Sequence, residues 1–157
     1  MQYERSISRD VADAMQENMM IHYLDCVKRE VIFIPEDYVS WLDEMITDEE
    51  INEEENETDK MLLQDIKRIN DEPDKFIEIP RTPTHEAFQI MEDFTEQLSD
   101  ERLQNNLVRA LNRPKPFHNF RFVLEEDNEV LQQWYKFRDA AYLEKAKEFL
   151  SENKIAI

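Results

Sequence analysis

The residues best suited to binding or chemistry are concentrated in two short segments of the C-terminal half. Residues 117–124 and 134–138 together contain six aromatic residues and two arginines in an otherwise acidic chain. Such a density marks either the centre of a core or a surface that binds something, because Trp, Tyr and Arg dominate binding hot spots. We therefore define a candidate binding patch consisting of Arg138, Trp134, Arg121, His118 and Phe120.

Arg138 is the most informative member of this patch. At about 100° per residue it projects from the middle of the apolar face of a predicted final helix. The preferred interpretation is structural: a buried or half-buried ion pair with a carboxylate such as Glu92 or Asp93, or stacking on a neighbouring ring. The functional interpretation is an anion site completed by Arg121 and His118, and a third is an anchor for a partner protein.

Other recognisable chemistry is sparse. His22, His85 and His118 each lack a second His or Cys at metal-ligand spacing, so no zinc site is predicted. Cys26 has no local partner that would make it a nucleophile. The chain contains no glycine, which excludes phosphate-binding loops, dinucleotide fingerprints and serine elbows in their usual forms. We predict no catalytic residue, no metal and no cofactor, and therefore no enzyme.

The absence of glycine also bears on helix ends. Backbone positions with positive φ must then fall mainly to Asn or Asp, which tolerate this conformation better than other residues with a side chain. Asn18, Asn70 and Asn112 each follow an apolar helical pattern. We expect them to end helices in the left-handed conformation.

The elements predicted to position these residues form one α+β domain over residues 1–157. Three segments alternate or are continuously apolar and read as a small antiparallel sheet: 21–24, 31–34 and 76–79. Apolar spacing predicts five to six helices, including one over 38–46 and a long C-terminal helix from about 126 to 150. Residues 117–124 fit either a short helix or an extended segment, and residues 47–59 are expected to form an acidic loop or frayed helix.

Charge is distributed unevenly along the chain. The formal net charge is −18, and residues 36–59 contain twelve acids and no Lys or Arg. Direct nucleic-acid binding is disfavoured, because affinity for phosphates rests on basic contacts. This acidic run lacks the glycine and ligand spacing of a calcium loop.

The same features suggest a compartment. No apolar run approaches the ~20 residues of a membrane span, and the first residues lack the apolar core of a signal peptide. The single Cys26 suits a reducing environment. We expect a soluble cytoplasmic protein.

Several segments together resemble a known family. The matching positions occur in order at sensible spacing: Tyr23-Leu24-Asp25, Glu30-Val31, Ile79-Pro80, Met91-Glu92-Asp93-Phe94, Leu98, Leu107, Ala110-Leu111, Pro116-Phe117, Phe120, Leu124, Trp134-Tyr135 and Phe137-Arg138. This pattern resembles uncharacterised protein family 0158, a bacterial family of unknown function. The resemblance implies an N-terminal hairpin, and it supplies no reaction, ligand or partner.

These observations favour a small interaction or regulatory module that binds another protein, one with a basic surface. A first alternative is a small-anion binder or enzyme that uses Arg138, Arg121 and His118. A second is an acidic mimic that inhibits a nucleic-acid-binding protein. The sequence leaves the oligomeric state open.

Overall fold

A computed structural model describes residues 6–157 of the chain. It confirms the α+β class, with a three-stranded antiparallel sheet and a long C-terminal helix. Two compact units are present, and each is described by itself: unit 1 contains residues up to Arg81 and the last twelve, Ala146–Ile157, and unit 2 contains Thr82–Lys145. Helix α7 contributes residues to both.

Unit 1 contains most of the N-terminal elements. They are α1 (Ile7–Gln16), β1 (Ile21–Asp25), β2 (Glu30–Ile34), the 3₁₀ helix η1 (Glu36–Trp41), α2 (Asp48–Glu53), α3 (Glu57–Asp71), the short 3₁₀ helix η2 (Pro73–Lys75) and β3 (Phe76–Ile79). Ser6 caps α1 by accepting from the Arg9 amide, as its position before an apolar helical pattern predicts. The three predicted strands all form, each within one residue of its expected bounds.

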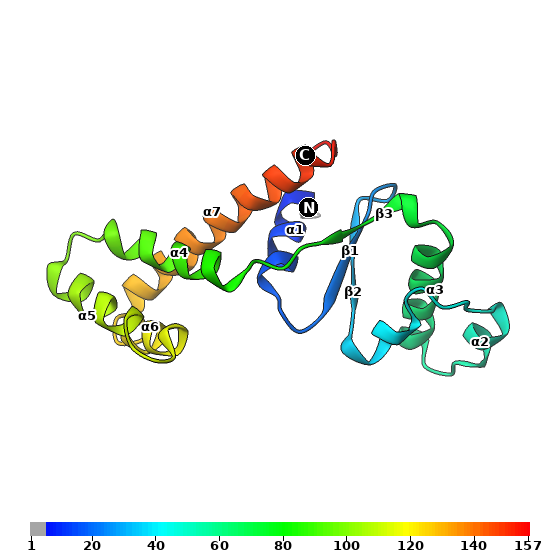
Figure 1. Ribbon diagram of the computed structural model, residues 1–157, viewed down its shortest axis with the longest axis horizontal. Helices are drawn as coiled ribbons and strands as arrows, with labels where there is room; N and C mark the ends of the chain where they lie inside the picture. Colours follow the sequence, from blue (N-terminus) through cyan, green and yellow to red (C-terminus); the bar gives the residue numbers. More distant parts are fainter. Residues whose placement is uncertain (1–5) are drawn as a thin grey trace, which may run out of the picture. The chain divides into compact units, whose positions relative to one another are not determined.

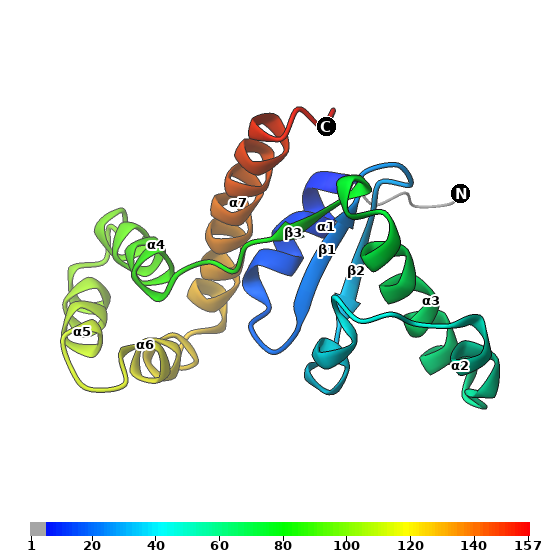
Figure 2. The same ribbon diagram turned by 45° about the vertical axis from the view of Figure 1, so that its right-hand side comes forward.

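The sheet has the strand order β2-β1-β3, with β1 antiparallel to both neighbours. Figures 1 and 2 show α1 on one face of this sheet and α3 on the other. The register places His22 opposite Phe33, so these two side chains share a face, and Leu24 and Val31 lie on that face too. The opposite face packs against α2 and α3 through a core of Ile32, Ile34, Ile46, Ile51, Leu63, Ile66, Ile69 and Phe76.

The acidic segment 47–59 contains α2 and the first turn of α3. Thr47 and Asn56 cap these helices with their side-chain oxygens, which satisfies amides that a loop would leave to water. The acids of the first turns also interact favourably with the helix dipoles. Ile51, the only aliphatic residue of this segment, is buried in the core, so one apolar contact and two caps offset the self-repulsion of the acids.

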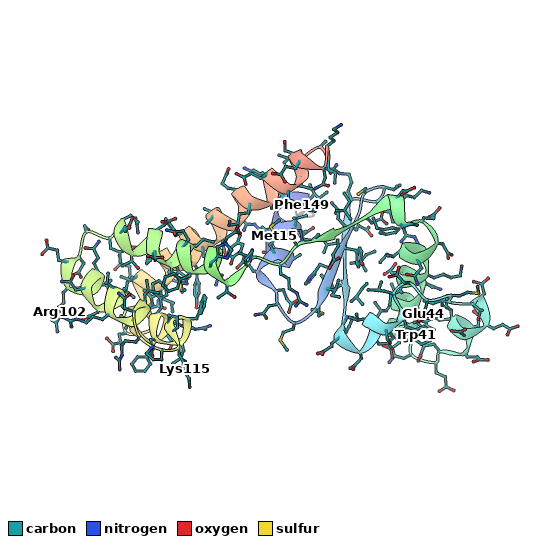
Figure 3. The ribbon with its side chains drawn as sticks, viewed as in Figure 1. Met15, Trp41, Glu44, Arg102, Lys115 and Phe149 are labelled. Atoms are coloured by element: carbon teal, nitrogen blue, oxygen red, sulfur yellow. The ribbon has the colours of Figure 1, made fainter. Side chains whose placement is uncertain are left out.

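The amphipathic helix predicted over residues 38–46 does not form. The chain makes η1 and then turns at Asp43, whose φ is 63°. Asn70 on α3 stabilises this turn: its amide donates to the carbonyls of Trp41 and Glu44, and its oxygen accepts from the Asp43 amide. Figure 3 shows Trp41 and Glu44 beside α3.

The expectation that Asn18, Asn70 and Asn112 would end helices in the left-handed conformation is wrong, whereas Asp43 is one of the Asp residues that the absence of glycine predicted for this conformation. Asn70 lies inside α3, and Asn112 ends α5 with a φ of −92°. Among the described residues, positive φ occurs instead at Arg29, Asp43, Lys115 and Lys154. Three of these are long cationic residues in exposed turns, so the turns themselves impose the conformation despite its cost of about 1 kcal/mol.

Unit 2 is helical. It contains α4 (Thr84–Glu96), α5 (Glu101–Leu111), α6 (Pro116–Leu124) and the first part of α7 (Asn128–Glu152). The ambiguous segment 117–124 is thus a helix. Lys115, labelled in Figure 3, precedes this helix, and its φ of 59° places it in the left-handed conformation. The core of unit 2 is formed by the buried side chains of Met91, Phe94, Leu107, Leu111, Phe120 and Leu124.

No helix within residues 6–157 combines the length and the apolar character that crossing a membrane requires.

Candidate binding groove between α1 and β2

The candidate patch predicted from sequence is divided between the core and the surface of unit 2. Phe120 is 1% exposed, and its ring centroid lies 5.0 Å from that of Trp134. Trp134 also packs edge-on against Phe94 at 5.4 Å. The structure therefore brings these two aromatic residues together, and both contribute to the helical core.

The two arginines of the candidate patch each pair with a different carboxylate. Arg138 lies 4.9 Å from the ring centroid of Tyr135 and 3.2 Å from a carboxylate oxygen of Asp139. Arg121 is exposed on α6 and pairs with Glu125 at 3.1 Å. Stacking and pairing of Arg138 are the kind of contacts that the structural interpretation describes, although Asp139 takes the place of Glu92 or Asp93. His118 is exposed.

Unit 1 contains a more pronounced feature, a groove between α1 and strand β2 with a volume of about 490 Å³. Sequence analysis did not identify it, because it depends on how α1 lies across the sheet. The local signals are acids at helical spacing in 10–17 and the continuous apolar run of β2 over residues 31–34. The groove is lined by Asp10, Asp13, Ala14, Glu17, Met20, His22, Arg29, Glu30, Val31 and Phe33. We call it the α1–β2 groove.

Its two walls differ in character. One wall carries Asp10 and Asp13 of α1, with Glu17 at the C-terminal end of that helix. The other wall is the β2 surface formed by Val31 and Phe33. Phe33 is 56% exposed, an unusual position for a large ring on a sheet that an adjacent helix covers in part. The groove therefore offers an apolar surface with carboxylates beside it.

His22 closes the base of the groove. It is 3% exposed, its ring meets Phe33 edge-on at 5.7 Å, and its Nε2 lies 3.6 Å from a carboxylate oxygen of Glu17. Glu17 accepts backbone hydrogen bonds from Met19 and Met20. Burial raises the pKa of Glu17, but these two amides and the nearby His22 together lower the pKa by more than burial raises it, so it lies below the ordinary value. Burial lowers the pKa of His22, and Glu17 only partly opposes this.

The lowered pKa of His22 predicts a pH dependence for unit 1. As pH falls, His22 takes up a proton near pH 6.5 in the unfolded state but only at lower pH in the folded state. The contribution of His22 to the free energy of unfolding is therefore fully present above pH 6.5 and is lost as pH falls toward the folded pKa. We expect the slope to stay below about 1.4 kcal/mol per pH unit, the limit for one proton. Urea unfolding followed between neutral and mildly acidic pH measures it. His22→Gln should flatten this slope, and His118→Gln, at an exposed site, should not; an unchanged slope in His22→Gln contradicts the assignment.

The described residues offer binding surface more readily than reactive groups. Among residues 6–157 no three His, Cys, Asp or Glu side chains are grouped so that they could hold a metal ion. Burial and the neighbouring Asp25 raise the pKa of the Cys26 thiol, which disfavours the nucleophilic thiolate.

Comparison with known proteins gives a family without an assigned activity. The model of an uncharacterised protein family, UPF0158, matches residues 6–157. The chain is 30% identical over 87 residues to the UPF0158 protein PA5073 of Pseudomonas aeruginosa, a match that covers 55% of this chain and 57% of that relative. No solved structure matches the chain.

Proposed function

We propose that this chain, which belongs to the uncharacterised protein family UPF0158, is a small interaction module that binds a basic segment of another protein. The observation that carries the proposal is the α1–β2 groove, where the exposed ring of Phe33 lies across from the acidic face of α1. We further propose that the module acts without catalysing a reaction, and that it does so in the cytoplasm, where a chain with one cysteine needs no oxidising environment.

Lysine and arginine side chains suit both walls of the groove. Their aliphatic stems can cover Val31 and Phe33 while the charged end approaches the carboxylates of α1. A guanidinium over the Phe33 ring would add a cation–π contact of about 0.5–1 kcal/mol. An acidic ligand would instead meet like charge along one wall, so the groove discriminates in favour of cations.

The acidic segment 47–59 supports the same partner from a distance. It belongs to unit 1, as the groove does, and α2 presents exposed carboxylates on both sides of the buried Ile51. Such a field raises the rate of encounter with a basic protein more than it raises contact affinity. Deleting the segment would remove Ile51 from the core, so we prefer to replace Glu49, Glu50, Glu53 and Glu54 by Gln. This variant should associate more slowly with the basic partner, and its association rate should depend less on salt concentration.

Phe33→Lys tests the proposal directly. The substitution places a cation where the partner's cation should bind, and we expect affinity to fall at least tenfold, about 1.4 kcal/mol, as for the loss of one strong interface contact. The measurement is affinity capture from lysate of the native host, followed by mass spectrometry and by titration of the captured protein. Capture should survive nuclease treatment and weaken as salt is raised.

Met45→Lys is the matched control, because Met45 is 86% exposed in the same unit and does not line the groove. It adds the same charge at an exposed apolar residue away from the groove. Equal capture by wild type, Met45→Lys and Phe33→Lys would overturn the proposed site. Loss of all capture after nuclease would point to a nucleic-acid complex and contradict the function.

A further inference from the structure

We propose that the partner segment binds as an additional β-strand on the outer edge of β2, with Lys or Arg at every second position directed into the α1–β2 groove. This inference rests on the proposed function, and it adds the binding mode and the sequence pattern of the partner. Addition of a strand supplies affinity through backbone hydrogen bonds and specificity through alternate side chains.

The first argument is that β2 has an open edge. It is an outer strand of the sheet and pairs with β1 on one side; within residues 6–157 no strand pairs with its other side. Edge strands are usually blunted by Lys, Pro or a bulge. The five residues of β2, Glu30–Ile34, contain neither Lys nor Pro, and their register with β1 is continuous.

The other edge of the sheet is shorter. Strand β3 has four residues against five in β2, and each strand contains one Glu and is followed at once by a proline, Pro80 after β3 and Pro35 after β2. β2 is held firmly in place, because its inward side chains Ile32 and Ile34 belong to the buried core. A rigid edge strand without an internal Lys, Pro or bulge is the template that strand addition needs, because little ordering entropy remains to be lost on the receiving side.

The second argument comes from the alternation of side chains on β2. Val31 and Phe33 face the groove, whereas Ile32 and Ile34 face the core. In an added strand, side chains beside Val31 and Phe33 would lie about 5 Å away on the same face, next to the acids of α1. These are the positions for Lys or Arg. The intervening positions would continue the row of Ile32 and Ile34, which favours β-branched apolar residues.

The charge of the groove selects a basic partner over a second copy of this chain. Among the described residues that line the groove, four are acids, Asp10, Asp13, Glu17 and Glu30, and one is an arginine, Arg29. A second β2 would bring another Glu30, and the Arg29 that precedes it, to this edge, whereas a segment with Lys or Arg at every second position would meet the acids with cations alone. The occupant is therefore a basic extended segment of another protein.

The experiment uses the full chain, labelled with ¹⁵N, and a peptide of alternating lysine and valine about six residues long, the usual length of a strand. Titration gives the affinity, and amide hydrogen exchange gives the location. We expect binding that weakens with salt, and slower exchange for amides of β2 in the complex. A control peptide in which proline replaces each valine keeps the charge but loses amide donors, and it should not bind.

Variants of Phe33 refine the test. Phe33→Lys should weaken peptide binding at least tenfold, whereas Met45→Lys should bind like wild type. Phe33→Leu keeps an apolar side chain and loses only the cation–π contact, so it should weaken binding by no more than about fivefold. Strand addition is overturned if the proline peptide binds equally well, if no lysine–valine peptide binds, or if binding leaves the β2 amides unprotected. Concentration-dependent protection of β2 without peptide would assign the edge to a second copy and also overturn it.

These outcomes are distinguishable from failure of the proposed function. If a lysate protein is captured through Phe33 but β2 stays unprotected in its complex, the interaction module stands and the strand mode fails. If the peptide protects β2 while lysate capture is indifferent to Phe33→Lys, the strand mode stands and the proposed cellular partner site fails.

Discussion

Replacing Phe94 by Ala is expected to lower the free energy of unfolding of unit 2 by about 3–5 kcal/mol, the usual cost of deleting a buried aromatic ring. Phe94 is 1% exposed, and its ring contacts three others edge-on: those of Phe120 at 6.4 Å, Trp134 at 5.4 Å and Phe137 at 5.4 Å. The loss therefore combines transfer free energy, a cavity and three aromatic contacts.

The two tryptophans make the measurement specific. Trp134 lies in unit 2 and Trp41 in unit 1, and the chain has no others. Denaturant unfolding of Phe94→Ala in a Trp41→Phe background reports unit 2, and the Trp134→Phe background reports unit 1. Phe122→Ala is the control, because Phe122 is 61% exposed and its loss should change stability by less than about 0.5 kcal/mol.

The same experiment tests the prediction of a single domain. If Phe94→Ala shifts both reporters equally, the chain unfolds as one cooperative domain, as expected from its length. If only the Trp134 transition shifts, the two units unfold separately. A loss below about 1 kcal/mol would contradict the assignment of Phe94 to the centre of the core.

Local features of the sequence predicted the elements well. Ser6 and Asp100 each precede a helix and cap it with a side-chain oxygen, a role that their residue types favour. The three strands followed from short apolar runs bounded by turns and prolines, and β3 in particular lies between Pro73 and Pro80. These signals are local, so no knowledge of the packing was needed to read them.

The failures came from tertiary contacts. Apolar spacing over 38–46 fits a helix, but the side chain of Asn70, far away in sequence, bonds the backbone there and fixes a turn at Asp43. Likewise, the density of aromatic residues in 117–124 could not distinguish core from surface until the segment was known to be helical. Phe120 and Phe122 then lie about 200° apart around α6, one buried and the other exposed.

The α1–β2 groove was beyond local reasoning for the same reason. Acids at positions 10, 13 and 17 are typical of any solvated helix face, and Phe33 in the continuous apolar run 31–34 looks like a core residue. Only the strand order, which leaves β2 at the edge, and the position of α1 turn these residues into a groove. The groove is therefore created by the topology of the sheet and the position of α1, and no local sequence motif marks it.

Asp25→Ala should lower the free energy of unfolding of unit 1 by about 2–4 kcal/mol. Asp25 is buried at the end of β1, where one carboxylate oxygen accepts from the amides of Val27 and Lys28 and the other from the guanidinium of Arg68. Removing one partner of a buried ion pair costs about 3–5 kcal/mol. The loss expected here is smaller, because Arg68 is one-third exposed and solvent screens its charge. The hairpin turn also loses its side-chain acceptor.

Acid should remove the same stabilisation from the wild type. Burial raises the pKa of Asp25. The Lys28 amide, the Arg68 side chain and the Val27 amide together lower this pKa by more than burial raises it, so the folded pKa lies below the ordinary value. The contribution is therefore complete above the unfolded pKa, near 4, and is lost as pH falls through the folded pKa. Urea unfolding followed by Trp41 in a Trp134→Phe background should show a shallower acid limb for Asp25→Ala.

Asp71→Ala distinguishes this buried pair from a surface pair. Asp71 pairs with Lys67 at 2.7 Å on the exposed side of α3, and such i,i+4 pairs contribute about 0.3–0.5 kcal/mol. We therefore expect Asp71→Ala to unfold almost like wild type at neutral pH. If Asp25→Ala were equally stable, the amides of the hairpin turn would have to find water or other acceptors without cost. Burial of the β1 end, where Arg68 also covers the Phe76 ring at 5.2 Å, argues against that result.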